Sequence, residues 1–88
     1  MGAFYYTYVL RCSDGRLYVG STTDLRRRLG EHREGKCRST IDRRPVALVY
    51  YEACRSDAGA RSREQQLKTG FGRAYLKRRL VHEVSAGG

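Results

Sequence analysis

Two short hydrophobic segments near the N-terminus have the pattern of a β-hairpin. Residues Phe4–Arg11 are aromatic and β-branched, and Leu17–Gly20 is a second run of the same kind. Between them stands Ser13-Asp14-Gly15, and an Asp-Gly pair is typical of a tight hairpin turn. A third strand is predicted at Val46–Glu52, directly after Pro45. The pattern therefore predicts three strands, of which the first two pair with each other.

A first helix is predicted after the hairpin. The segment Ser21-Thr22-Thr23-Asp24 places a hydroxyl three residues before an acid, which is a helix-start signal. This helix runs through Glu34 and stops at Gly35, since glycine commonly ends helices. A basic loop, Lys36–Arg44, connects it to the third strand.

Two further helices are predicted in the C-terminal half. Ser56-Asp57 begins the second, which ends near Thr69-Gly70, and Phe71-Gly72 predicts a break. The last helix carries Tyr75, Leu76, Leu80 and Val84 on one side. Arg61 stands where an apolar residue is expected, so the second helix is predicted to pack loosely.

The element order β-β-α-β-α-α predicts an α/β (α+β) fold, with a small three-stranded antiparallel sheet flanked by helices. A chain of 88 residues makes one domain, which we assign to residues 1–84, with residues 85–88 as a disordered tail. A domain this short buries only about two-thirds of its unfolded surface. We therefore expect a shallow groove, which suits a polymer better than a small metabolite.

The charge narrows the class of partner. The sequence contains eighteen Lys and Arg residues and nine Asp and Glu residues, which gives a net charge of +9. A strongly basic domain attracts phosphate polymers or anionic membranes. Arg greatly outnumbers Lys, and arginine contacts phosphate through two donors at once. The longest apolar run, Val46–Tyr51, is too short to span a membrane, so we expect a nucleic acid partner and no membrane.

The cysteines argue against a zinc site and for a reduced, cytoplasmic protein. Cys12, Cys37 and Cys54 form no Cys-x-x-Cys pair, and only two histidines are available to join them. An odd number of cysteines without a signal peptide is typical of a protein that keeps its thiols reduced.

Five residues form a candidate catalytic set. Tyr8 and Tyr18 lie on the predicted hairpin, Arg28 and His32 lie one turn apart on the first helix, and Glu64 faces inward on the second. Each has an ordinary structural role when taken singly. The tyrosines suit strands, the arginine stem can cover an apolar face, the histidine can bond a backbone carbonyl, and the glutamate can pair with Arg28.

Together these residues resemble a known signature. Tyr6-Thr7-Tyr8 and Tyr18-Val19-Gly20, in which the motif tyrosine Tyr18 comes ten positions after Tyr8, resemble the paired motif of the GIY-YIG nuclease superfamily. Arg28 and His32 match the arginine and frequent histidine of the next helix. Glu64 matches the metal-binding acid, and Lys68 follows one turn later. The resemblance covers about residues 4–80. Within the superfamily, the chain resembles the short stand-alone bacterial members, which are described as excinuclease-like proteins or endonucleases.

The sequence departs from the family pattern at a few positions. Tyr6 stands for the first glycine of the motif and Thr7 for its isoleucine, which concerns strand packing. Arg33 stands where many relatives have an asparagine after the histidine.

The resemblance implies a metal-dependent endonuclease. A tyrosine serves as general base or positions the water, for which the phenol pKa of about 10 has to fall by roughly 2–3 units. We favour Tyr8 in that role, with Tyr18 holding water or phosphate, and leave the reverse assignment open. Arg28 neutralises the phosphate, His32 assists by hydrogen bonding, and Glu64 holds one Mg²⁺ or Mn²⁺ with water. Most other acids stand in turns and caps, so one metal is favoured over two.

Basic residues of the first helix, the following loop and the second helix are expected to contact the phosphate backbone, with little sequence specificity. They are Arg26, Arg27, Arg33, Lys36, Arg38, Arg43, Arg44 and Lys68. DNA is favoured over RNA as substrate, and repair, recombination and defence against foreign DNA are all open as pathways.

Three alternatives stand beside the nuclease hypothesis. The first is a non-catalytic nucleic-acid-binding module, and the second is a nuclease subunit that needs a protein partner. The third is a structural or protein-interaction domain, for which the exposed Tyr50-Tyr51 pair offers a contact surface.

Overall fold

The order of elements predicted from the sequence is confirmed. The computed structural model describes residues 3–87, with side chains for residues 3–80. Its elements are β1 (Tyr5–Arg11), β2 (Leu17–Thr22), α1 (Leu25–Arg33), the 3₁₀ turn η1 (Ile41–Arg43), β3 (Ala47–Cys54), α2 (Asp57–Leu67) and α3 (Gly70–Gly87). The side chains of residues 85–88, predicted as a tail, lie outside the described part, so that prediction stays untested.

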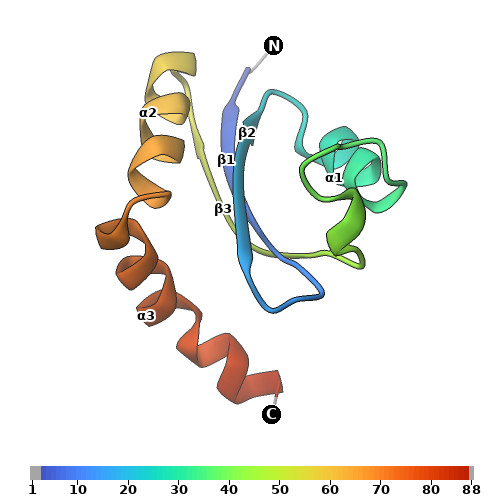
Figure 1. Ribbon diagram of the computed structural model, residues 1–88. Coiled ribbons are helices and arrows are strands. Elements are labelled where there is room, and N and C mark those ends of the chain that lie inside the picture. Colours follow the sequence, from blue (N-terminus) through green and yellow to red (C-terminus); the bar gives the residue numbers. More distant parts are fainter. Residues whose placement is uncertain (1–2, 88) are drawn as a thin grey trace.

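The three strands form one antiparallel sheet in the order β2-β1-β3 (Figure 1). The central strand β1 places Tyr8 opposite Gly20 of β2 on one side and opposite Tyr51 of β3 on the other. Successive side chains of a strand point to opposite faces. Tyr6 and Tyr8 therefore share one face of β1, and Thr7 and Val9 share the other.

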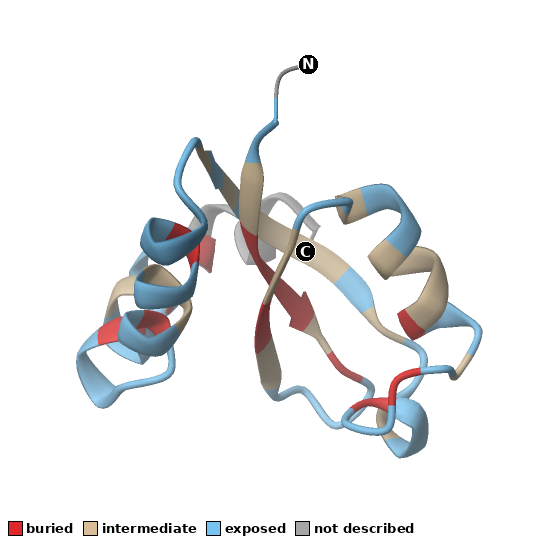
Figure 2. Ribbon diagram, turned by 90° about the horizontal axis from the view of Figure 1, so that it is seen from above, coloured by how far each residue is buried: buried red, intermediate tan, exposed pale blue. Residues whose placement is uncertain are grey.

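Helices cover the two faces of the sheet differently. α2 and α3 lie along one face, and α1 with the loop after it lies on the other (Figures 1 and 2). The apolar core is on the α2–α3 side, where Val9 and Val19 pack against Leu67 and Leu76. The buried residues of Figure 2 concentrate in β1 and β2 and in the helix surfaces that face them. Buried polar side chains occur on both sides, with Thr7 bonded to Ala60 of α2 on the α2–α3 side and His32 and Thr40 on the α1 side.

A polar network fixes α2 and α3 to the edge strand β3. Arg63 of α2 donates from Nε and Nη2 to the Glu52 carboxylate at 3.0 Å. Tyr50 donates to the same carboxylate at 2.6 Å and is 3.0 Å from the Tyr75 hydroxyl of α3. The Arg63 guanidinium also lies 4.9 Å from the centre of the Tyr75 ring. This network holds the two helices in a fixed position on the sheet.

The loose packing predicted for α2 is wrong. Arg61 is exposed and pairs with Asp57 one turn earlier, at 3.2 Å. The buried positions Ala60 and Leu67 carry the contact with the sheet, so Arg61 does not have to be apolar.

Two strand boundaries differ from the prediction. β2 continues to Thr22, so Ser21 and Thr22 belong to the strand and not to a helix start. Asp24 alone is the N-cap of α1, and its carboxylate accepts from the Arg27 backbone N–H at 3.1 Å. β3 is shifted toward the C-terminus, covering Ala47–Cys54, because its pairing with β1 extends to Tyr5.

The predicted break at Phe71-Gly72 is also wrong, because the chain turns earlier, at Lys68 and Thr69. Thr69 caps α3, since its Oγ1 accepts from the Gly72 N–H at 3.1 Å. Gly72 lies inside α3. A Cβ at this position would overlap the backbone of Gln66 and Leu67, so the position requires glycine. Glycine here allows close approach of two helices and does not end one.

None of the helices within residues 3–87 is long and apolar enough to cross a membrane.

Candidate active site

The hairpin and α1 bring four of the five predicted site residues together. Tyr8 and Tyr18 lie on the sheet face that α1 covers, with ring centres 6.4 Å apart. His32, from the last turn of α1, contacts both. Its ring centre is 5.7 Å from that of Tyr8 and 5.3 Å from that of Tyr18. Strand alternation and helical spacing thus produce the convergence that the sequence predicts.

A buried chain of hydrogen bonds runs through this cluster. Tyr8 Oη is 2.8 Å from His32 Nε2, and His32 Nδ1 is 2.7 Å from Thr40 Oγ1. Tyr8 is 1% exposed, and His32 and Thr40 are 0% exposed. The histidine therefore bonds two side-chain hydroxyls, and not the backbone carbonyl of the structural interpretation. Sequence reasoning missed Thr40, because a threonine in a basic loop carries no signal for burial.

Arg28 lies at the exposed margin of the cluster. Its Nη1 donates to Glu31 Oε1 at 2.9 Å, and its guanidinium acts as a hydrogen-bond donor to the Tyr8 hydroxyl. Its side chain is 37% exposed, so a phosphate can reach it. The predicted ion pair with Glu64 does not form, because Arg28 pairs with Glu31 of its own helix.

The charges of the cluster differ from the expected ones. Burial raises the pKa of Tyr8 to about 12, and the hydrogen bond from Arg28 offsets only part of this. Burial, and then the charge of Arg28, lower the pKa of His32. At neutral pH Tyr8 is a phenol and His32 is a neutral imidazole. In the protein alone the Tyr8 pKa is thus raised and not lowered, since burial outweighs the nearby cation. The lowering that a general base requires, with Arg28 and a bound metal as its sources, stays a prediction.

Exposure separates the two motif tyrosines. Tyr8 is covered almost completely, whereas Tyr18 is half-buried at the margin of the cluster. A water molecule or a phosphate can therefore contact the exposed part of the Tyr18 side chain. This disfavours Tyr8 as the phenol that meets the attacking water, because its buried hydroxyl is enclosed by Arg28 and His32.

Glu64 reaches the site from the other face of the sheet. It stands on α2, and its Oε1 accepts from Ser21 Oγ of the edge strand β2 at 2.7 Å. Lys68 donates to Oε2 at 2.8 Å. Burial raises the pKa of the Glu64 carboxyl, but hydrogen bonds from Lys68 and Ser21 outweigh this, so the pKa is lowered overall. β2 therefore separates the carboxylate from the phenols, and only a substrate lying over this edge can touch both.

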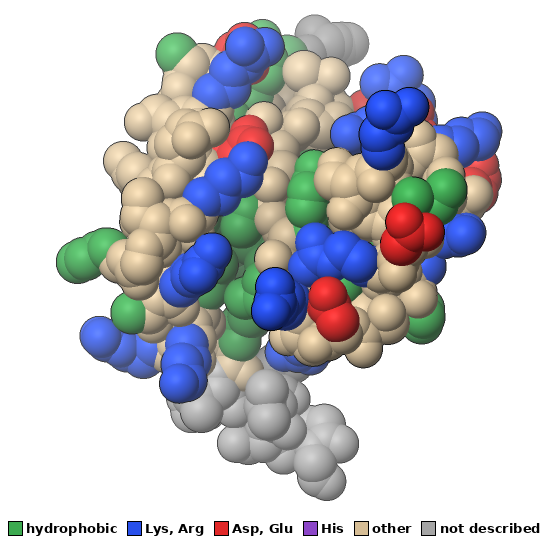
Figure 3. Space-filling model, viewed as in Figure 1, with side chains coloured by type: hydrophobic (Ala, Val, Ile, Leu, Met, Phe, Trp, Pro, Cys, Tyr) green, Lys and Arg blue, Asp and Glu red, His purple; other side chains and the backbone are tan. Residues whose placement is uncertain are grey.

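The basic residues surround this edge. Figure 3 shows Lys and Arg side chains over α2 and α3 on one side and over α1 and its loop on the other. A strip of hydrophobic and uncharged side chains lies between them, over the sheet. Most of the residues expected to bind nucleic acid are exposed, but Arg43 is half-buried and pairs with Asp14 at 3.2 Å. Arg44 donates to the backbone carbonyls of Ile41 and Arg33.

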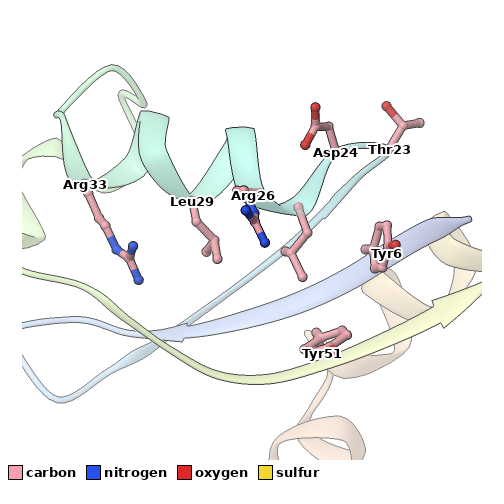
Figure 4. A pocket seen from close by; sticks show the side chains of 8 residues that line it. Tyr6, Thr23, Asp24, Arg26, Leu29, Arg33 and Tyr51 are labelled. Carbon is pink, nitrogen blue, oxygen red and sulfur yellow. The ribbon is translucent and has the colours of Figure 1, made fainter.

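A hollow of about 510 Å³ lies between α1 and the β1–β3 part of the sheet. The rings of Tyr6 and Tyr51 form its floor, and Arg26 and Arg33 point into it from α1 (Figure 4). Neither arginine has an acidic partner among the residues with described side chains, whereas Arg27 pairs weakly with Asp24 at 4.0 Å. Arg26 and Arg33 are thus available to a phosphate.

This arrangement coincides with a family match over most of the chain. Residues 4–78 match the GIY-YIG catalytic domain. The chain belongs to the GIY-YIG family. Members of this family are nucleases that generally act on nucleic acid with a divalent metal. The short stand-alone kind of GIY-YIG protein that the motifs resemble is confirmed by the relatives.

The relatives are named only as UPF0213 proteins. One from Natronomonas pharaonis is 40% identical over 85 residues, which cover 96% of this chain and 99% of the relative. One from Desulfotalea psychrophila is 44% identical over 66 residues, and the match spans 60% of that longer protein. The solution NMR structure of the UPF0213 protein BH0048 from Bacillus halodurans matches with a TM-score of 0.54 at 36% identity, over 83% of this chain and 81% of that one.

The GIY-YIG site fits a single, mostly hydrated cation. No group of three or more His, Cys, Asp or Glu able to hold a metal occurs among the described residues. Glu64 is one carboxylate with a 17% exposed side chain, and the Ser21 hydroxyl is beside it. Mg²⁺ typically takes one or two carboxylates and keeps several waters, so this oxygen set suits it. The metal-ligand role of Glu64 stays a prediction.

A substitution of Gly20, in the second GIY-YIG half-motif, tests how tightly the cluster is packed. A Cβ at this position would stand 2.6 Å from Tyr8 Oη and 2.7 Å from Cζ. Gly20→Ala should therefore displace the buried Tyr8 ring from His32 and cost about 1–3 kcal/mol of stability. We expect a melting temperature lower by roughly 4–8 °C per kcal/mol in calorimetry.

The matched control is Gly30→Ala, because a Cβ at this helical position meets nothing within 4 Å. It should leave the melting temperature unchanged or raise it, since alanine favours helix. Equal melting temperatures for Gly20→Ala and the unchanged protein would show that the Tyr8 ring does not rest on β2.

Proposed function

We propose that this protein is a metal-dependent endonuclease that hydrolyses phosphodiester bonds of DNA with little sequence specificity. The observation that supports this most directly is the cluster of Tyr8, Tyr18, Arg28 and His32 on one sheet face in a chain of the GIY-YIG family. A purely structural role does not require a half-exposed guanidinium and phenol beside a buried neutral imidazole.

Each residue of the cluster has a separate part in this proposal. Arg28 binds the scissile phosphate and neutralises the charge that develops on its oxygens. Tyr18 takes a proton from the attacking water while its own hydroxyl proton passes to solvent, and the departing ester oxygen takes up a proton from solvent. The water oxygen forms the new bond to phosphorus, and the bond to one ester oxygen breaks. Tyr8 orients the Arg28 guanidinium, which donates to the Tyr8 hydroxyl, and His32 holds that hydroxyl in place on the buried side.

Glu64 is the residue that would hold one Mg²⁺ or Mn²⁺, with Ser21 orienting its carboxylate. When bound, such a cation supplies charge stabilisation to the phosphoryl and leaving oxygens. Lys68 neutralises Glu64 in the protein alone and is free to contact a backbone phosphate once the carboxylate is engaged elsewhere.

The surface suits a long anionic substrate. Basic side chains flank the β2 edge on both sides (Figure 3). Phosphate contacts set affinity but carry no sequence information. We therefore propose backbone binding of DNA by the exposed arginines and lysines. We place the protein in the cytoplasm, with repair and recombination as its settings.

Glu64→Gln tests the enzymatic part. The amide keeps the shape but loses the charge that a cation needs, so several kcal/mol of transition-state stabilisation should disappear. Because each 1.4 kcal/mol or so is a factor of ten in rate, cleavage should fall about a thousandfold. The assay uses labelled single-stranded, duplex and branched DNA and RNA, each with Mg²⁺, Mn²⁺ or chelator, and binding should persist.

Glu34→Gln is the matched control, since Glu34 is exposed and pairs only with Lys36, at 3.1 Å. It should cleave like the unchanged protein. Undiminished cleavage by Glu64→Gln would remove the metal assignment. Binding without cleavage by the unchanged protein on every substrate would favour a binding module or a subunit that needs a partner.

Salt dependence tests the phosphate contacts. If Arg26 and Arg33 each contact one phosphate, replacing both with Gln should reduce the slope of log binding constant against log salt by about 2. Fluorescence anisotropy with a labelled duplex measures the slope. Arg16→Gln with Arg55→Gln removes the same charge at exposed positions outside α1 and the loop that follows it. An equal change in both double variants would show a response to net charge alone.

A further inference from the structure

Thr40 is a buried hydroxyl in a strongly basic loop, and the side chains next to it in the sequence face solvent. Arg38 and Ser39 before it and Ile41 after it are exposed, whereas Thr40 is 0% exposed. Loop hydroxyls ordinarily remain in water, because burying one without a partner costs free energy. The partner here is His32, whose Nδ1 is 2.7 Å from Thr40 Oγ1.

Backbone hydrogen bonds fix this hydroxyl in place. The Thr40 N–H donates to the Cys37 carbonyl at 3.1 Å, and the Thr40 carbonyl accepts from the Arg43 N–H at 2.9 Å. Cys37 is itself buried. Both polar backbone groups of Thr40 are therefore occupied, and its side chain is held against the imidazole by a loop that has little freedom at this point.

The donors around Tyr8 determine which nitrogen of His32 carries the proton. The Arg28 guanidinium lies beside the Tyr8 hydroxyl and can only donate, so it favours a Tyr8 lone pair directed toward it. The phenol proton then points to His32 Nε2, 2.8 Å away. In a neutral imidazole one nitrogen accepts and the other donates. Nε2 is the acceptor, so Nδ1 carries the proton and donates to Thr40 Oγ1.

We propose that Thr40 is a positioning residue, whose Oγ1 fixes the Nδ1–H tautomer of His32 and so keeps the Tyr8 lone pairs directed at Arg28. In the opposite tautomer Nε2–H donates to Tyr8, and the phenol proton turns toward the Arg28 donors and competes with them. The catalytic consequence rests on the proposed function, while the tautomer is a property of the protein alone. The arrangement follows the general rule that a third group orients a catalytic imidazole.

The first test needs no variant and no substrate. Two-bond ¹⁵N–¹H NMR correlations of the imidazole distinguish Nδ1–H from Nε2–H. We expect His32 to be in the Nδ1–H form near neutral pH. An Nε2–H form in the unchanged protein would overturn the proposal.

Two variants then separate the hydroxyl from the methyl group of Thr40. Thr40→Val keeps the shape but removes Oγ1, so Nδ1 loses its acceptor and the Nε2–H tautomer should become populated. Thr40→Ser keeps the hydroxyl and should retain the Nδ1–H form. An unchanged tautomer in Thr40→Val would contradict the assignment. The melting temperature of each variant sets a working temperature at which all three proteins are folded.

The cleavage assay supplies the second readout. Thr40→Val should lower kcat by about ten- to a hundredfold, as expected when the partner that orients a functional histidine is lost. KM should change less than about twofold, because the exposed basic residues that bind DNA are untouched. Thr40→Ser should restore kcat to near the unchanged value. Equal losses in both variants would show that the packing of the methyl group matters and not the hydroxyl.

The two proposals fail in different ways. Absence of cleavage by the unchanged protein on every substrate would reject the nuclease, and the NMR measurement would still decide the role of Thr40. Normal cleavage together with an Nε2–H histidine, or with an active Thr40→Val, would leave the nuclease standing and reject the positioning role.

Discussion

The α1 side of this protein depends on one buried chain of hydrogen bonds, from Tyr8 through His32 to Thr40. It joins β1, the last turn of α1 and the loop before β3, whereas the apolar cluster of Val9, Val19, Leu67 and Leu76 lies on the opposite face. Breaking one link would leave a buried polar group without a partner, which costs about 1–3 kcal/mol. The same chain presents Arg28 at the surface, so the layer that holds α1 in place also organises the candidate site.

One face of the sheet thus carries the apolar core, and the other carries the candidate site. On one face, Val9, Val19, Leu67 and Leu76 pack as an ordinary apolar core beneath α2 and α3. On the other, buried polar groups hold α1 at a cost that natural proteins accept chiefly at functional sites. The edge strand β2 connects these faces, because Gly20 lies under the Tyr8 ring and Ser21 bonds Glu64. A substrate over this edge can therefore contact groups from both layers.

Short-range signals in the sequence were sufficient for the fold and for four of the site residues. The Asp-Gly turn, the alternation of Tyr8 and the four-residue spacing of Arg28 and His32 are local patterns with a direct geometric meaning. Thr40 was missed because its burial depends on a contact eight residues away, across the end of a helix. The raised pKa of Tyr8 in the protein alone could not be predicted, because the degree of burial is a tertiary property. The turn between α2 and α3 was misplaced because Gly72 serves a close helix contact that no local pattern reveals.

The most direct test of this account is cleavage by Tyr18→Phe, which keeps the aromatic ring but removes the hydroxyl offered to the attacking water. Tyr5→Phe is the control, because Tyr5 belongs to the same hairpin and points to the opposite face. With Mg²⁺ or Mn²⁺ and DNA, the account predicts cleavage by the unchanged protein and by Tyr5→Phe. For Tyr18→Phe it predicts a rate lower by about a hundredfold or more with DNA binding retained. Equal cleavage by Tyr18→Phe and the unchanged protein would contradict it.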